Sequence, residues 1–355
     1  MKSRYTIDGS RSLESMLDTI CEASRKALLL AIPEDSLKGI ALGGGYGRGE
    51  GGVFRERGEE LPYNDVEFFV FVSRNRFLAR RKWGETVTSI GHELTEQFGI
   101  EIEFRIIGTN EIQQAPPSMF YYDLIMGHRW ILGGDSLLRN CEHHRDPSAL
   151  QYSEATRLLM NRASGLLFAR KLLETESLDE KDSDFIFRNI RKAQLATGDA
   201  ILTSRGGYHW SCVVRHERLN RLAIDTAILR DHQVGLSFKL HPFRTSLCHE
   251  KLTDLHRSVS HRVEMTFLEI ESKRLGHEFT DSGIYIKYEP KVPTSPRLRN
   301  RMINFRDRGL PGLLDTSHPR ESFLNFLCFG LWNAPEKTLN SNEMERFHLL
   351  WKRCA

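Results

Sequence analysis

Five of the seven residues from Gly43 to Gly49 are glycine, in the order Gly-Gly-Gly-Tyr-Gly-Arg-Gly. Glycine loses more backbone freedom on folding than any other residue, so a helix or strand is not expected to continue through this segment. The short apolar run Gly39–Leu42 that precedes it is typical of a strand. We therefore expect a strand that ends in a tight turn, where the backbone N–H groups can approach a ligand closely because no Cβ intervenes.

A second strand with two acids at its start follows the turn. Val66–Val72 is rich in β-branched and aromatic residues, which predicts a buried strand. Asp65 and Glu67 are two positions apart, so their side chains share one face, about 6.5–7 Å apart at roughly 3.3 Å per residue. Two carboxylates at this spacing can hold a hard cation such as Mg²⁺ together. Because the strand carries no further charge beyond Glu67, a counterion is favoured over an ordinary solvated face.

A third strand supplies another carboxylate. Residues 100–106 alternate between apolar and charged side chains, which places Glu101, Glu103 and Arg105 on one face of a strand. Either glutamate can serve as the third acid, and both face the same side. Helical spacing predicts helices over residues 11–31 and 78–98, and Gly99 suits the end of the second.

Two other interpretations of the glycine segment fit less well. The segment Gly47–Gly52 formally matches the G-x-G-x-x-G pattern of dinucleotide-binding folds, and an acid follows later. That fold needs a helix directly after the glycines, whereas Gly58 and Pro62 leave no room for one. A phosphate-binding P-loop is excluded because no Gly-Lys-Ser/Thr follows the glycines.

The segments Gly44-Gly-Tyr-Gly-Arg-Gly-Glu50 and Asn64-Asp-Val-Glu-Phe-Phe-Val70 together resemble the signature of the polymerase-β-like nucleotidyltransferase superfamily. The glycine segment is most similar to that of the uridylyltransferases that act on the PII signalling protein. The resemblance covers about residues 38–138. It implies an α+β fold, in which a nucleotidyltransferase-type mixed sheet with flanking helices is followed by an α-helical bundle.

The resemblance also implies roles for individual residues. Gly44 and Gly45 would hold the triphosphate of an NTP, and Asp65 and Glu67 would bind two Mg²⁺ ions, with Mn²⁺ as an alternative. Glu103 would complete one metal site and help to activate the acceptor hydroxyl, since its place before Phe104 matches the third-acid pattern better than that of Glu101. The further candidate nucleotide contacts are Arg48 in the turn and Lys192 on a helix expected over residues 184–204.

The chain departs from the family in the distance between its two motifs. Nineteen residues run from Tyr46 to Asn64, more than is usual, which indicates an inserted hairpin or loop at about residues 51–60. Such segments on a rigid scaffold often carry recognition or act as lids. We expect the insertion to contact the acceptor or cover the site, and the alternative is a loop that only decorates the surface.

Strand patterns end near residue 150 and long helical patterns take over. Helices are expected over residues 154–174, 184–204, 210–230 and 247–274, followed by a tail with an aromatic helix at 322–332. This predicts a catalytic domain at residues 1–148, a helical bundle at 149–275 and a helical extension at 276–355.

Composition limits the partners. A formal net charge of +3 does not indicate a basic nucleic-acid coat, although an RNA acceptor stays open beside a small molecule or a protein. No apolar run reaches the length of a membrane span, and six scattered cysteines without a C-x-x-C pair favour reduced thiols in a cytoplasm. The expected function is a Mg²⁺-dependent nucleotidyltransferase, and the alternative is a catalytically silent nucleotide-sensing or protein-binding module on the same fold.

Overall fold

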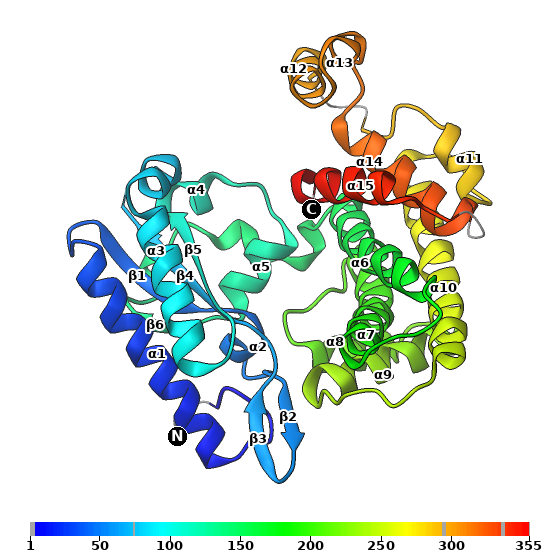
Figure 1. Ribbon diagram of the computed structural model, residues 1–355. Helices are drawn as coiled ribbons and strands as arrows, with labels where there is room; N and C mark the ends of the chain where they lie inside the picture. The colour runs from blue at the N-terminus through cyan, green and yellow to red at the C-terminus, as the bar shows by residue number, and fades with distance from the viewer. Residues whose placement is uncertain (1–3, 74, 293–295, 335–337, 355) are drawn as a thin grey trace. The chain divides into compact units, whose positions relative to one another are not determined.

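The computed structural model describes residues 4–73, 75–292, 296–334 and 338–354 (Figure 1). Their contacts divide the chain into two compact units. The first contains Met1–Gln151, Arg205–Ala223 and Leu236–Phe243, and the second contains Tyr152–Ser204, Ile224–Gly235 and Arg244–Ala355. The expected boundary after residue 148 lies close to the division at residue 151, but two later segments belong to the first unit. The expected extension at 276–355 lies within the second unit.

A mixed four-stranded sheet forms the centre of the first unit, in the order β5-β4-β1-β6. The central strand β4 runs antiparallel to β1 and parallel to β5, while β6 pairs antiparallel with the other side of β1. The strands are β1 (Leu37–Leu42), β4 (Val66–Val72), β5 (Ile102–Gly108) and β6 (Arg129–Leu132). The strand expected at residues 66–72 is confirmed, and the one expected at 100–106 begins and ends two residues later.

Two long helices cover one face of this sheet, as Figure 1 shows. The helices are α1 (Arg11–Ala31) and α3 (Arg76–Phe98), and their apolar stripes form one core with the even-numbered residues of β4 and β5. The predicted stop at Gly99 is confirmed, because this residue ends α3 in the left-handed conformation and its N–H donates to the carbonyl of Thr95.

The opposite face carries the acids. Phe69 and Phe71 of β4 pack there in a second core with Ile107 of β5. The short helices α4 (Thr109–Gln114) and α5 (Met119–Met126) contribute to that core. Because side chains alternate along a strand, Glu67 lies on the same face as Phe69 and Phe71, at the start of β4.

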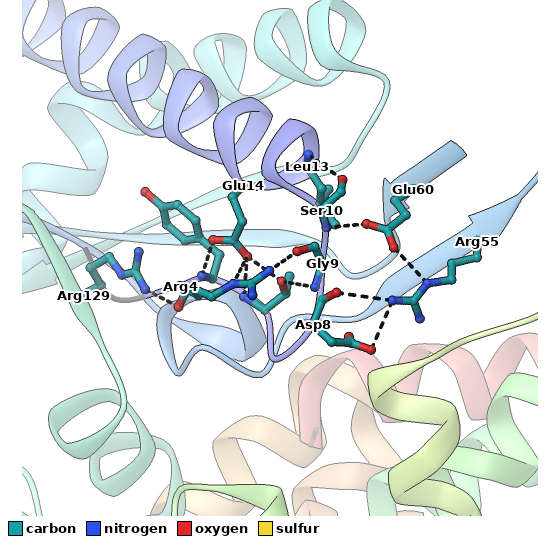
Figure 2. A network of polar contacts seen from close by, with 11 residues as sticks. Arg4, Asp8, Gly9, Ser10, Leu13, Glu14, Arg55, Glu60 and Arg129 are labelled. Carbon is teal, nitrogen blue, oxygen red and sulfur yellow. Dashed lines mark hydrogen bonds and ion pairs between the residues drawn. The ribbon is translucent and has the colours of Figure 1, made fainter. Parts of the chain in front are cut away.

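The expected insertion is a β-hairpin of β2 (Val53–Glu56) and β3 (Glu59–Pro62). Its two turn residues, Arg57 and Gly58, both have positive φ angles, which is the geometry that matches the twist of two antiparallel strands. Figure 2 shows how the hairpin meets the segment before α1. Arg55 lies 3.1 Å from the carboxylate of Asp8, and Glu60 accepts a hydrogen bond from the N–H of Ser10.

The second unit is helical. Its described helices are α6 (Tyr152–Leu173), α7 (Glu180–Ser204), α9 (Thr226–Leu240), α10 (His249–Leu275), α11 (Ser282–Lys287), α12 (Arg297–Arg308), α13 (Leu310–Leu314), α14 (Pro319–Cys328), the π-helix η4 (Phe329–Asn333) and α15 (Ser341–Cys354). Helices α6, α7 and α10 pack against one another, and α9 continues into the first unit at Leu236. The buried carboxylate of Glu271 on α10 accepts hydrogen bonds from Thr156 and Tyr285, 2.6 and 2.7 Å long.

The single helix expected over residues 210–230 is wrong. Two helices occupy this region, α8 (Cys212–Leu219) and α9, with a break after Asn220. The physical reason is a second helix start. The Asp225 carboxylate accepts a hydrogen bond of 2.8 Å from the N–H of Ala227, which caps α9.

The architecture as a whole is mixed α+β with a small sheet and many helices. None of the helices in the described part of the chain combines the length and the apolar character needed to cross a membrane.

Candidate active site

The glycine turn lies directly against the carboxylate of Glu67, and four of its residues form the short helix α2 (Gly44–Gly47), although the sequence predicted no helix here. The N–H of Gly43 donates to the carbonyl of Glu67 over 2.8 Å, so the turn is fixed to the start of β4. Gly44 has a φ of +59°, and a Cβ at this position would lie 2.7 Å from Glu67 Oε2. At Gly45 a Cβ would lie 3.2 Å from the carbonyl oxygen of Glu50. Both glycines therefore allow close packing, and only glycine fits position 44 without strain.

The three candidate acids come from the starts of two neighbouring strands. Glu67 of β4 is in register with Glu103 of the parallel strand β5, which puts the two side chains on one face. Asp65 lies immediately before β4 and is exposed. Glu101 is exposed before the start of β5, and its carbonyl accepts a hydrogen bond from the N–H of Val66. The strand register thus places Glu103 directly beside Glu67. Glu101 lies one residue before the start of β5.

Arg105 is a member of the site that the sequence reasoning did not assign. Its guanidinium lies 3.3 Å from Glu103 Oε2 and 3.8 Å from Glu67 Oε1. The alternation of β5 had already placed Arg105 on the same face as the acids, and that was the available signal. The arginine partly neutralises the two glutamates.

Burial raises the pKa of the Glu67 carboxyl, and the negative charges of Asp65 and Glu103 act in the same direction. Arg105 and Arg48 lower this pKa and oppose the effect. The ionised form of Glu67 therefore gains from any further cation, which is the electrostatic situation of many functional carboxylates.

The donor set agrees in its chemistry with Mg²⁺, which prefers carboxylate oxygens. Within the described residues, no group of three His, Cys, Asp or Glu side chains is arranged to hold a metal ion. This arrangement is compatible with Mg²⁺, since that ion is commonly bound by one or two carboxylates together with substrate phosphates and water. Asp65 and Glu67 are the two acids that could hold such an ion, and Glu67 is the one placed against Gly44 of the turn.

Tyr46 connects the glycine turn to the residues before Asp65. Its side chain is fully buried, and its hydroxyl donates to the carbonyl of Gly52 over 3.0 Å and accepts from the N–H of Tyr63 over 2.9 Å. Burial raises the pKa of this phenol to about 12. Asn64 adds a second tie, because its side-chain oxygen accepts from the N–H of Gly52. The aromatic residue among the glycines therefore fixes the chain on both sides of the hairpin.

Arg48 and Lys192 occupy different units. The Arg48 guanidinium lies 3.0 Å from the carboxylate of Asp123 on α5, with only 13% of its side chain exposed. Asp123 also accepts a hydrogen bond of 3.1 Å from the hydroxyl of Tyr208. Lys192 is exposed on α7 of the second unit. The contact of Arg48 with Asp123 is one that the sequence motif did not indicate.

Glu50, at the end of the glycine motif, binds a segment far along the chain. It is 6% exposed and accepts hydrogen bonds from the Ser211 hydroxyl, the Cys212 N–H at 2.9 Å and the Cys212 thiol at 3.0 Å. Burial acts to raise the pKa of Glu50, but these hydrogen bonds and the nearby Lys239 hold it below its usual value. Glu50 thereby caps α8 and attaches it to the turn. The sequence offered no signal for this contact, because its partners are more than 160 residues away.

Comparison with known proteins does not identify the chain. No family model matches it, and no curated protein matches it. The likeness of its two motifs to a nucleotidyltransferase signature therefore remains a resemblance.

Proposed function

We propose that this protein is a nucleotidyltransferase that moves a nucleoside monophosphate from an NTP to an acceptor hydroxyl. One observation carries the proposal, namely the position of the Glu67 carboxylate against Gly44 of a glycine turn that follows β1. A triphosphate bound by the backbone of the turn would lie next to this carboxylate. Asp65 and Glu103, the other acids of the constellation, flank Glu67 along β4 and across to β5.

The reaction is an in-line substitution at phosphorus. The acceptor oxygen forms a bond to the α-phosphorus of the NTP, the bond from that phosphorus to the bridging oxygen breaks, and pyrophosphate leaves. The acceptor hydroxyl loses its proton, and the carboxylate of Glu103 is the candidate to orient that hydroxyl and receive the proton. Mg²⁺ ions, when bound, would stabilise the attacking and the leaving oxygen.

The remaining nucleotide contacts follow from the same assignment. Gly44 and Gly45 would present backbone N–H groups to phosphate oxygens. Arg48 would act mainly through charge, because its guanidinium is already bound to Asp123. Lys192 on α7 belongs to the second unit, and its role as a further nucleotide contact stays a prediction from the sequence.

A second function is favoured by the position of Arg105. Arg105 forms ion pairs with Glu67 and Glu103 and so places a positive side chain where a catalyst would use a metal ion. A nucleotide-sensing module on the same fold would keep such an arginine and would bind an NTP without transferring it.

The experiment that separates the two functions measures binding and chemistry independently. NTP binding is followed by equilibrium dialysis, and pyrophosphate release is followed with each NTP, Mg²⁺ and a cell extract as the source of acceptor. We expect release by the wild-type chain. We expect its loss in Asp65→Ala and Glu67→Ala, and wild-type release by Glu96→Ala, which removes an exposed acid on α3.

A variant that keeps more than about a tenth of the wild-type rate has lost less than about 1.4 kcal/mol of transition-state stabilisation, and this would contradict the metal-site assignment. NTP binding without pyrophosphate release under any condition would decide for the sensing module.

A further inference from the structure

A groove runs along the outer edge of the sheet between α3 and β5. Its volume is about 830 Å³. Strand β5 is the last in the sheet order, so no described strand pairs with its outer edge. The polar and charged side chains along the groove include Arg76, Arg80, Thr88, Ser89, His92 and Arg105. Glu85 is the acid among the described residues that line it.

Two glycines of α3 shape this groove. A Cβ at Gly91 would lie 2.9 Å from the carbonyl oxygen of Ile102, so the helix and the strand are in close contact at that point. Two turns earlier, at Gly84, a Cβ would meet no atom within 4 Å. The groove is therefore open along the first half of α3 and closes toward Gly91.

Arg105 connects the groove to the proposed active site. It lines the groove, and its guanidinium also contacts Glu103 and Glu67. A ligand that binds to Arg105 from the groove therefore shares this guanidinium with the carboxylates. Of the three acids, Glu103 is on the same strand as Arg105 and is the one assigned to the acceptor hydroxyl.

The charges of the groove select the kind of ligand. Arg80 is exposed and makes no hydrogen bond or ion pair with any described residue. Arg76 is bound on one side to Glu111 at 2.7 Å, and 42% of its side chain is exposed. Guanidinium groups bind phosphate through two parallel N–H···O bonds, and they do so better than lysine, which acts as a point charge. Arg76 and Arg105 are already paired with glutamates, which leaves Arg80 as the guanidinium of the groove that favours a phosphate group.

We propose that this groove binds a phosphate group of the acceptor, so that the acceptor class is a phosphorylated hydroxyl compound. The proposal rests on the nucleotidyltransferase function and adds the chemistry of its second substrate. It also gives Arg105 a role in the order of events. Because Arg105 would exchange its carboxylate partners for the acceptor phosphate, binding of the acceptor frees Glu67 and Glu103 for a cation.

The test measures binding to the full-length chain in the absence of NTP, by isothermal titration calorimetry. The probes are glucose 6-phosphate, glucose and a 5′-phosphorylated RNA of 12 nucleotides. We expect a phosphorylated probe to bind and glucose not to bind. Preference for the sugar phosphate would assign a small-molecule acceptor, and preference for the RNA would assign a nucleic-acid end. Both outcomes support the phosphate site, and binding of neither phosphorylated probe overturns it.

Matched variants locate the binding. Arg80→Ala should lower the affinity for the bound probe about tenfold or more, and Arg80→Lys should recover only part of this affinity. Arg81→Ala removes an exposed neighbour on α3 that does not line the groove, and it should leave the affinity unchanged. An equal loss in both alanine variants would mean general attraction to a basic surface and would overturn the proposal.

Two further measurements separate this inference from the proposed function. If Arg80→Ala weakens NTP binding as much as probe binding, the groove belongs to the nucleotide, and the acceptor assignment is wrong. If the phosphorylated probe binds in an Arg80-dependent way but pyrophosphate is never released, the groove is a phosphate site and the transferase function is the part that fails.

Discussion

Replacing Gly44 with alanine tests the contact on which the proposed function depends. The backbone at this position has a φ of +59°, and an L-residue in this left-handed region costs about 1–2 kcal/mol. The new Cβ would lie 2.7 Å from Glu67 Oε2, whereas ordinary van der Waals contact begins at 3.4 Å. The carboxylate must therefore move by about 0.7 Å, which a flexible glutamate can do by rotating its side chain. Stability should fall by little more than the backbone cost.

Transfer should fall much further than stability. A displacement of about 1 Å in a catalytic group can cost on the order of a hundredfold in rate, because the reacting groups are no longer aligned. Gly99→Ala is the matched control. Its φ is +68°, so the backbone strain is similar, but no atom lies within 4 Å of its Cβ position. Urea denaturation and pyrophosphate release are measured on both variants and on the wild type.

We expect both variants to lose about 1–2 kcal/mol of stability and only Gly44→Ala to lose about a hundredfold in transfer. Equal transfer by the two variants would refute the reasoning, since the position of the Glu67 carboxylate against the turn would then be irrelevant to activity. A stability loss well above that of Gly99→Ala would show that the carboxylate cannot relax, and the steric argument would be wrong.

Two more predictions concern the neighbouring acids. Glu103→Gln should lower turnover by orders of magnitude while Glu101→Gln lowers it little, because only Glu103 is in register with Glu67. Pyrophosphate release by both variants measures this effect. The reverse result would make Glu101 the third acid. Glu50→Ala should cost about 2–4 kcal/mol at pH 7 in urea unfolding, because it leaves buried donors of Ser211 and Cys212 without an acceptor. Since folding lowers the pKa of Glu50 below its ordinary 4.5, its stabilisation is present above that pH and is lost as the pH falls through the lowered value. The difference in free energy of unfolding between wild type and variant should therefore become smaller in acid. A difference that stays constant with pH would contradict the assignment of an ionised Glu50.

The local elements of the first unit could be predicted because each has a short-range cause. The apolar stripe of α1 and the unbroken run of β4 determined those boundaries in the sequence. The neighbourhood of Glu67 and Glu103 also follows from local rules, since two strands that alternate with period two place their acids on one face. The sequence left one question open, the choice between Glu101 and Glu103, because only the pairing register distinguishes two residues of the same face.

The contacts that hold the glycine motif in place could not be predicted. Arg48 and Glu50 read as parts of a phosphate-binding signature, yet Arg48 binds Asp123 and Glu50 binds Ser211 and Cys212. These partners lie 75 and more than 160 residues away. The sequence gives no reason to prefer them over the other polar residues of the chain. The same long-range contact supports the start of α8 at Cys212, where Ser211 is the N-cap and the sequence predicted a helix start two residues earlier, at residue 210.

The hairpin inserted between the turn and β4 was expected to contact the acceptor or cover the site, and its contacts favour another role. Arg55 and Glu60, from its two strands, are bound to Asp8 and Ser10 before α1, as Figure 2 shows. A lid would need these side chains free to move. Deleting the two outer residue pairs, 55 with 60 and 56 with 59, would keep the turn at 57–58 and the inner pairs of the ladder.

This deletion should lower stability by about 1 kcal/mol or less, the worth of exposed ion pairs, and it should leave both NTP affinity and the KM for the acceptor unchanged. Equilibrium dialysis and transfer kinetics measure the two quantities. A higher KM for the acceptor would restore the recognition role, and lost NTP binding would make the hairpin part of the nucleotide site. With both unchanged, the hairpin is an anchor for the N-terminal segment. Acceptor recognition would then depend on the α3–β5 groove, at the opposite end of the acid constellation from Asp65, where Arg105 meets Glu103.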